Sequence, residues 1–232
     1  MGSRPPGFGI SPPATAVLRR PPSLARPTNG HGRPPDRPEG DGREDALDRP
    51  VPPAAVLATL LVIAGDVMLF AGLIFAFWVL RLAAPVWPPP LQPRLPLGVT
   101  GVNTLVLLAS SAAVAVALRV GGRGDLAGLV RWLRTGALLG GLFLVIQGYE
   151  WIRLVGFGLT VASGTYGALF YTLIGAHAAH VLAALAWLAI TLGLARHGRL
   201  VPGPAPSLHA CALYWHFVVA LWPVLYVSVY LL

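Results

Sequence analysis

The sequence predicts an all-α integral membrane protein: a bundle of five transmembrane helices that follows a disordered N-terminal tail. Three observations support this prediction. The chain is 55% hydrophobic and only 11% charged, whereas soluble domains carry roughly 25% charged residues. The apolar residues form five long stretches, each near the roughly 20 residues needed to cross a bilayer. Residues 1–53 hold 8 of the 17 Arg and 6 of the 9 acidic residues.

Residues 1–53 are the predicted disordered tail, and residues 54–232 are the predicted membrane domain. The tail holds 13 of the 23 prolines and few aromatic residues, so it buries too little apolar surface to offset its ordering entropy. The net charge of +8 comes mainly from nine Arg spread over the ends of the apolar stretches. That distribution is typical of a membrane protein and argues against nucleic-acid binding. A single cysteine, Cys211, excludes an intrachain disulfide and a cysteine-based metal cluster.

The five spans are expected from hydropathy and length. They run approximately over Ala54–Leu82, Gly98–Arg119, Trp132–Leu154, Tyr166–Arg196 and Ser207–Leu232. Pro52 and Pro53 suit the first turn of a helix, where proline is tolerated. Six prolines make the 83–98 connection a stiff, extended loop, and Pro223 is expected to kink the last span.

The distribution of Arg predicts the orientation of the bundle. Six Arg lie in or beside the connections that share a side with the tail, and three lie on the opposite side. Cytoplasmic connections carry the excess of positive charge. We therefore expect a cytoplasmic N-terminus and a C-terminus outside.

Two acidic residues, Asp66 and Glu150, lie within the spans. Asp66 is in the middle of the first span, where a charge costs at least about 2.5–3.5 kcal/mol. It must face the protein interior, be protonated or have a partner. Glu150 lies late in the third span, closer to the interface. The two carboxyl groups indicate either a proton relay or a hydrogen-bonded hub that fixes helix packing.

Three histidines accompany these acids. His177 and His180 are three residues apart, which places both imidazoles on one face of the fourth span, and His216 opens the fifth span. Such residues could ligate a metal, but the Glu-x-x-His pattern of a di-iron bundle is absent. The alternative is that the histidines make hydrogen bonds between helices.

Small polar residues mark the helix faces that are expected to pack. These are Asn103, Thr104, Ser110 and Ser111 in the second span and Gln147 in the third. Hydroxyl and amide side chains commonly bond transmembrane helices to one another.

Several segments, in order, resemble one family, subunit III of the haem–copper respiratory oxidases. They are Ala64–Gly72, Trp87–Pro89, Val102–Ser111, Gln147–Trp151, Gly164–Gly167, Gly175–Val181, Tyr214–Val218 and Tyr226–Tyr230. The family has seven-helix and five-helix forms, and the chain is similar to the five-helix form. Two departures stand out: Asp66 occupies the place of the usual Glu, and Val219 occupies the place of the usual Asp.

The resemblance implies an accessory subunit of a terminal oxidase in the bacterial plasma membrane, a complex that reduces O₂ to water and pumps protons. It implies that the chain itself binds no haem or copper, which lie in partner subunits, and that it binds phospholipid. The implied partners are the haem-bearing catalytic subunit I, subunit II and a small subunit IV, which would replace the two missing helices. The implied role is to stabilise the catalytic subunit and support proton uptake. Asp66, Glu150, His177, His180 and His216 are the implied internal polar network.

Other functions remain open at this stage. Within the family, the complex could be a quinol oxidase or a nitric oxide reductase. Outside it, a polytopic transporter would use Asp66 and Glu150 along a substrate path and would show internal repeats or broken helices. An intramembrane metalloprotein would use His177, His180 and His216.

Overall fold

The computed structural model describes residues 53–90, 93, 95–199 and 206–231, all within the compact unit Val51–Leu232. The predicted tail lies outside the described residues except for Pro53. The helices are α2 (Ala54–Ala83), α3 (Leu97–Gly122), α4 (Leu126–Gly156), α5 (Gly164–Arg196) and α6 (Pro206–Tyr226), and α6 continues into the π-helical turn η1 (Val227–Leu231). The described residues form no strand, and each of five helical segments is long and apolar enough to span a membrane. The predicted fold class is confirmed.

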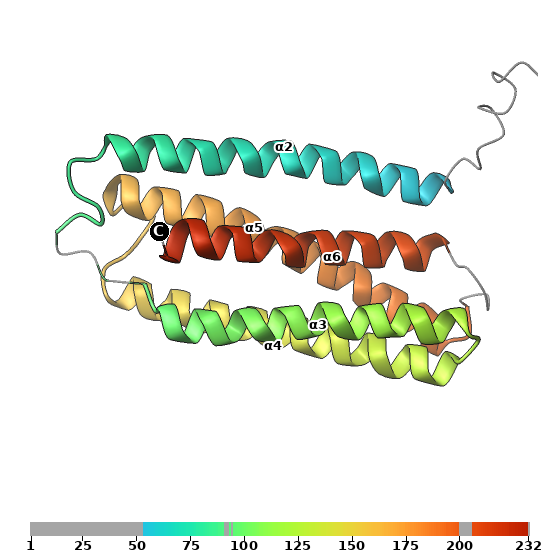
Figure 1. Cartoon of the computed structure of the whole chain (residues 1–232). Coiled ribbons are helices and arrows are strands. Elements are labelled where there is room, and N and C mark those ends of the chain that lie inside the picture. The colour runs from blue at the N-terminus through green and yellow to red at the C-terminus, as the bar shows by residue number, and fades with distance from the viewer. Residues whose placement is uncertain (1–52, 91–92, 94, 200–205, 232) are drawn as a thin grey trace, which may run out of the picture. The chain divides into compact units, whose positions relative to one another are not determined.

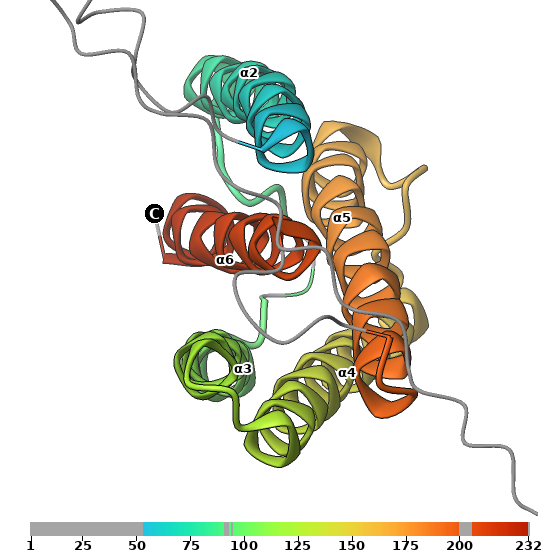
Figure 2. The same ribbon diagram turned by 90° about the vertical axis from the view of Figure 1, so that its right-hand side faces the viewer.

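Successive helices run in opposite directions (Figure 1). Viewed from its end, the bundle has α6 in contact with α2, α3 and α5, while α4 packs against α3 and α5 (Figure 2). The central place of α6 explains why it carries two of the largest fully buried side chains, Trp215 and Trp222. The helix continues through Pro223 and widens into η1 four residues later.

The helix α4 begins at Leu126 and not at Trp132 as predicted. The reason is a helix cap: Asp125 Oδ1 accepts a 2.8 Å hydrogen bond from the Gly128 N–H, which satisfies a first-turn donor. Only three residues therefore join α3 to α4. Arg131, which the predicted span Trp132–Leu154 left in the connection, lies within α4 together with Arg134.

Two glycines allow α4 to approach its neighbours closely. A Cβ on Gly136 would lie 2.8 Å from Val114 Cγ2 of α3. A Cβ on Gly140 would lie 2.5 Å from Trp215 Cη2 of α6. Small residues are favoured where spanning helices pack, because dispersion contacts replace the hydrophobic driving force there.

Candidate internal polar network

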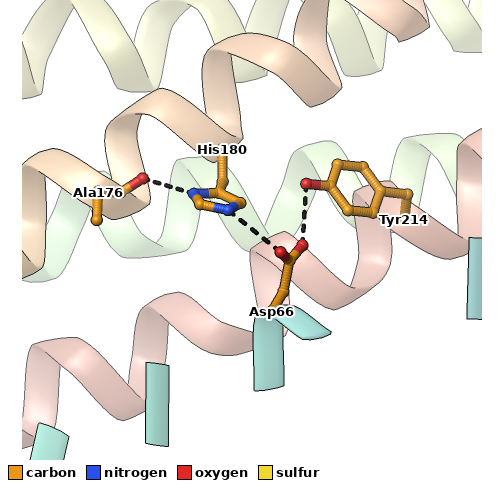
Figure 3. A network of polar contacts seen from close by, with 4 residues as sticks. All are labelled: Asp66, Ala176, His180 and Tyr214. Atoms are coloured by element: carbon orange, nitrogen blue, oxygen red, sulfur yellow. Dashed lines mark hydrogen bonds and ion pairs between the residues drawn. The ribbon is translucent and has the colours of Figure 1, made fainter. Parts of the chain in front are cut away.

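The carboxyl group of Asp66 contacts two other helices (Figure 3). Tyr214 of α6 donates its hydroxyl hydrogen to Asp66 Oδ2 at 3.1 Å. His180 Nε2 of α5 lies 3.4 Å from Asp66 Oδ1. The side chains of Asp66 and His180 are mostly buried. The partner that an acid in the middle of a span requires is therefore present, and no bridging water is needed to reach it.

The other ring nitrogen of His180 determines how protons are arranged in this contact. Nδ1 lies 2.7 Å from the carbonyl oxygen of Ala176, one turn earlier in α5. A carbonyl oxygen only accepts, so Nδ1 carries a hydrogen. Nε2 then either donates a second hydrogen to an ionised Asp66 or accepts one from a protonated Asp66. The pair is electrically neutral in both arrangements, and it differs between them only in the position of one proton.

His177 lies in a different environment from His180. It is 1% exposed, and neither ring nitrogen has a hydrogen-bond partner within the described residues. Its ring stacks on Trp222 at a centroid distance of 5.0 Å. Phe70 of α2 makes edge contacts with both imidazoles. Both rings contact Phe70 and so share one face of α5, but His177 packs there as an aromatic group.

Glu150 is 4% exposed and lies in the last two turns of α4. Its Oε1 accepts a 3.2 Å charged hydrogen bond from Arg153 Nη1, and the Arg153 side chain is about half exposed. The pair therefore joins a buried carboxylate to a cation that reaches the end of the span. Among the described residues, neither Asp66 nor any of the three histidines is hydrogen-bonded to Glu150 or ion-paired with it.

Most of the remaining polar residues join helices in pairs. His216 Nδ1 lies 2.6 Å from Ser111 Oγ of α3. Asn103 Nδ2 donates to the carbonyl oxygen of Phe143 at 3.1 Å. There are three further contacts. Thr104 accepts a hydrogen bond from Trp222 Nε1, and Gln147 donates one to the Tyr230 hydroxyl. Ser110 donates one to the Leu107 carbonyl within α3. Four of these five contacts connect different helical segments.

The predicted site residues thus fall into several separate contacts. Asp66 and His180 meet directly, whereas Glu150, His177 and His216 each have other neighbours. Across the ranges that the structure describes, no three His, Cys, Asp or Glu side chains gather as a metal-ligand set. His177, His180 and His216 therefore do not form the site that the metalloprotein alternative requires.

Sequence reasoning missed the aromatic partners of the polar residues, namely Tyr214, Trp222 and Tyr230. All three lie in α6 or η1. Their spacing of eight residues turns each one about 80° from the one before around a helix of 3.6 residues per turn, so no single helix face marks them, and the available signal is their residue type. Buried Tyr and Trp usually place their O–H or N–H on a partner.

These observations define a class: an integral membrane protein of five spanning helices whose interior holds a carboxyl–imidazole–phenol contact. Residues 50–232 match the sequence model of the family described as cytochrome c oxidase subunit III. The "Cytochrome c oxidase subunit 3" of Corynebacterium diphtheriae is 34% identical over 192 residues, which cover 81% of this chain and 92% of that protein.

Relatives from two other organisms show similar sequence identity. The "Probable cytochrome c oxidase subunit 3" of Nocardia farcinica is 33% identical, covering 81% of this chain and 92% of the relative. The "Cytochrome c oxidase subunit 3" of a Synechocystis species is 34% identical, with coverage of 78% and 77%. The chain belongs to the cytochrome c oxidase subunit III family. It is a subunit of a haem–copper oxidase, and hence a member of a complex with other oxidase subunits.

Proposed function

We propose that this chain is an accessory subunit that carries no redox centre, stabilises the haem-bearing subunit I and supports proton uptake by the oxidase. The contact of Asp66 with His180 and Tyr214 is the observation that carries the proposal. An intramembrane carboxyl group beside an imidazole is costly unless it is partnered, and such groups are typical of proton relays.

The neutral charge of the Asp66–His180 pair suits proton handling. One proton moves between Oδ1 and Nε2 without leaving a net charge in the bilayer. The Tyr214 hydroxyl stabilises the ionised carboxylate by donating to Oδ2. In this proposal the pair is the part of the internal network that handles protons. His216–Ser111 joins α6 to α3, and Glu150–Arg153 neutralises a buried carboxylate within α4.

The outer surface of α2 supports the proposed partners. Its most exposed large apolar side chains recur every seven residues and so lie on one face: Leu61, Met68, Phe75 and Leu82, each about 70% exposed or more. In the proposal, a small subunit IV covers this face in place of the two helices that the seven-helix form has, and subunits I and II complete the complex. Phospholipid covers the remaining apolar surface.

The proposed location is the plasma membrane of a bacterium, with the N-terminus in the cytoplasm and the C-terminus outside, because Arg is more frequent on the side of the tail. The proposed domain division is a tail over 1–53 and a membrane domain over 54–232. The relatives carry the name cytochrome c oxidase, and we therefore propose cytochrome c as the electron donor of the complex.

Replacing Asp66 tests the proton role. Asp66→Asn keeps an oxygen that can accept from His180 but removes the group that exchanges a proton. In the purified oxidase complex, reconstituted in vesicles, we expect proton uptake during turnover to slow severalfold. Asp125→Asn is the matched control, because Asn also caps helices and Asp125 lies between α3 and α4. Equal uptake rates in both variants would refute the proton role of Asp66.

A further inference from the structure

An open pocket of about 570 Å³ lies where α2 ends and α3 begins. The starts of α3 and α5 and the end of α6 lie at the same end of the bundle as the end of α2 (Figure 1). The lining includes Arg81 from the last turn of α2, Trp87 from the connection, Tyr166 from the first turn of α5 and Tyr230 from η1. Because spanning helices end here, the pocket lies at the level of a membrane–water interface.

Arg81 supplies a positive charge that no carboxylate neutralises within the described residues. Its guanidinium carbon lies 5.2 Å from the centroid of the Trp78 ring. The three acids of the described ranges have other partners: Asp66 contacts His180, Asp125 caps α4 and Glu150 pairs with Arg153. A guanidinium offers five N–H donors in a planar fork, which matches the oxygens of a phosphate group.

Tyr166 adds a hydroxyl group to the pocket. The residue is 6% exposed, and its ring packs edge-on against Trp87 at a centroid distance of 5.0 Å. The hydroxyl makes no hydrogen bond with the described residues. Its oxygen nevertheless keeps some exposed surface, since it is absent from the fully buried polar atoms that lack a partner. It therefore opens on the pocket that the residue lines. A buried phenol without a protein partner indicates a donor available to a ligand.

The start of α3 adds a third group of donors. Pro96 precedes the helix and provides no side-chain cap, so the N–H groups of the first turn have no side-chain acceptor. This turn borders the pocket, because Leu95 and Leu97 are part of its lining. Helix N-termini favour anions. The cation, the phenol and the helix end all favour a negatively charged ligand.

We propose that this pocket binds the phosphodiester group of a membrane glycerophospholipid through the Arg81 guanidinium and the Tyr166 hydroxyl. The volume exceeds what one phosphate group fills, and Pro88, Pro89 and Leu95 give the remaining lining an apolar surface suited to glycerol and the first acyl carbons. The inference rests on the proposed function, in which the chain binds phospholipid, and assigns a specific headgroup site to it.

The test uses the intact oxidase complex in detergent, with native mass spectrometry to count bound lipids. Delipidated complexes are titrated with dioleoyl-phosphatidylglycerol or with inorganic phosphate. The variants are Arg81→Gln and Tyr166→Phe. Their controls are Arg123→Gln, an exposed Arg at the other end of α3, and Tyr149→Phe, an exposed Tyr of α4. The ratio of haem to this chain is measured in each sample.

We expect Arg81→Gln to weaken binding of one phosphatidylglycerol by about tenfold, the effect of losing a hydrogen bond to a charged group. Tyr166→Phe should weaken it less, and both controls should match the wild type. Unchanged lipid binding in Arg81→Gln would overturn the proposal. So would saturation by inorganic phosphate that displaces the lipid, which would make free phosphate the ligand. A loss of haem in Arg81→Gln at unchanged lipid content would assign the pocket to an acidic group of another subunit. Absence of haem from the wild-type sample would instead contradict the proposed function.

Discussion

The contact between Gly140 and Trp215 gives a sharp test of the packing. A Cβ at position 140 would lie 2.5 Å from Trp215 Cη2, about 1 Å closer than ordinary van der Waals contact. Trp215 is 1% exposed and lies among the buried side chains of the core. We expect Gly140→Ala to destabilise the chain by about 1–3 kcal/mol, the range for overpacking a closely packed core. The result includes the small gain in helix propensity that alanine brings.

The neighbouring glycine provides the control. No atom lies within 4 Å of the position that a Cβ on Gly141 would take, so Gly141→Ala adds the same methyl group without a clash. Thermal unfolding of this chain within the detergent-solubilised complex measures both variants. Gly140→Ala should lower the transition temperature by several degrees, and Gly141→Ala should leave it unchanged or raise it. Equal transition temperatures for the two variants would refute the packing argument.

Two further predictions concern hydrogen bonds between helices. Tyr214→Phe removes the donor to Asp66 Oδ2 and should cost about 0.5–1.5 kcal/mol of stability. It should also slow proton uptake, but less than Asp66→Asn does. Tyr149→Phe is the control and should change neither quantity. Asn103 donates to the Phe143 carbonyl while its Oδ1 has no partner among the described residues, so Asn103→Leu should change stability by only about 1 kcal/mol. Asn103→Asp, which removes the donor and buries a charge, should cost more in the same thermal assay. An Asn103→Asp variant as stable as Asn103→Leu would contradict this assignment.

Hydropathy was sufficient to predict the five spans, because a bilayer requires long apolar helices whose backbone groups bond internally. It did not predict the start of α4, because Arg131 and Arg134 interrupt the apolar stretch that begins at Leu126 and the boundary depends on the Asp125 cap. Capping chemistry was visible in the sequence, and it would have corrected that boundary.

The candidate site was predictable as a set of residues but not as a set of contacts. The cost of burying Asp66 implied a partner, and the sequence offered three histidines for it. Only the crossing of α2 and α5 selects His180, and only the position of α6 brings Tyr214 to the same carboxyl group. His177 lies three residues away on the same helix, yet it faces Trp222. Such choices depend on helix rotation and crossing, which periodicity does not determine.

The place of Val219 shows the same limit of pattern reasoning. The family usually has Asp at this position, so an interaction made by that Asp is lost or replaced in this chain. The side chain is 2% exposed within the apolar core. The polar contact between α6 and Asp66 comes from Tyr214, five residues earlier.

The central claim, that this chain works as an accessory subunit of a haem–copper oxidase, is tested most directly by purification from the native membrane. The chain carries an affinity tag and is extracted in mild detergent with native lipid, and haem is measured by reduced-minus-oxidised spectra against the amount of tagged chain. We predict a constant haem-to-chain ratio across the purification, with a haem-bearing subunit in the same complex. A tagged chain that purifies alone, without haem, would contradict the claim.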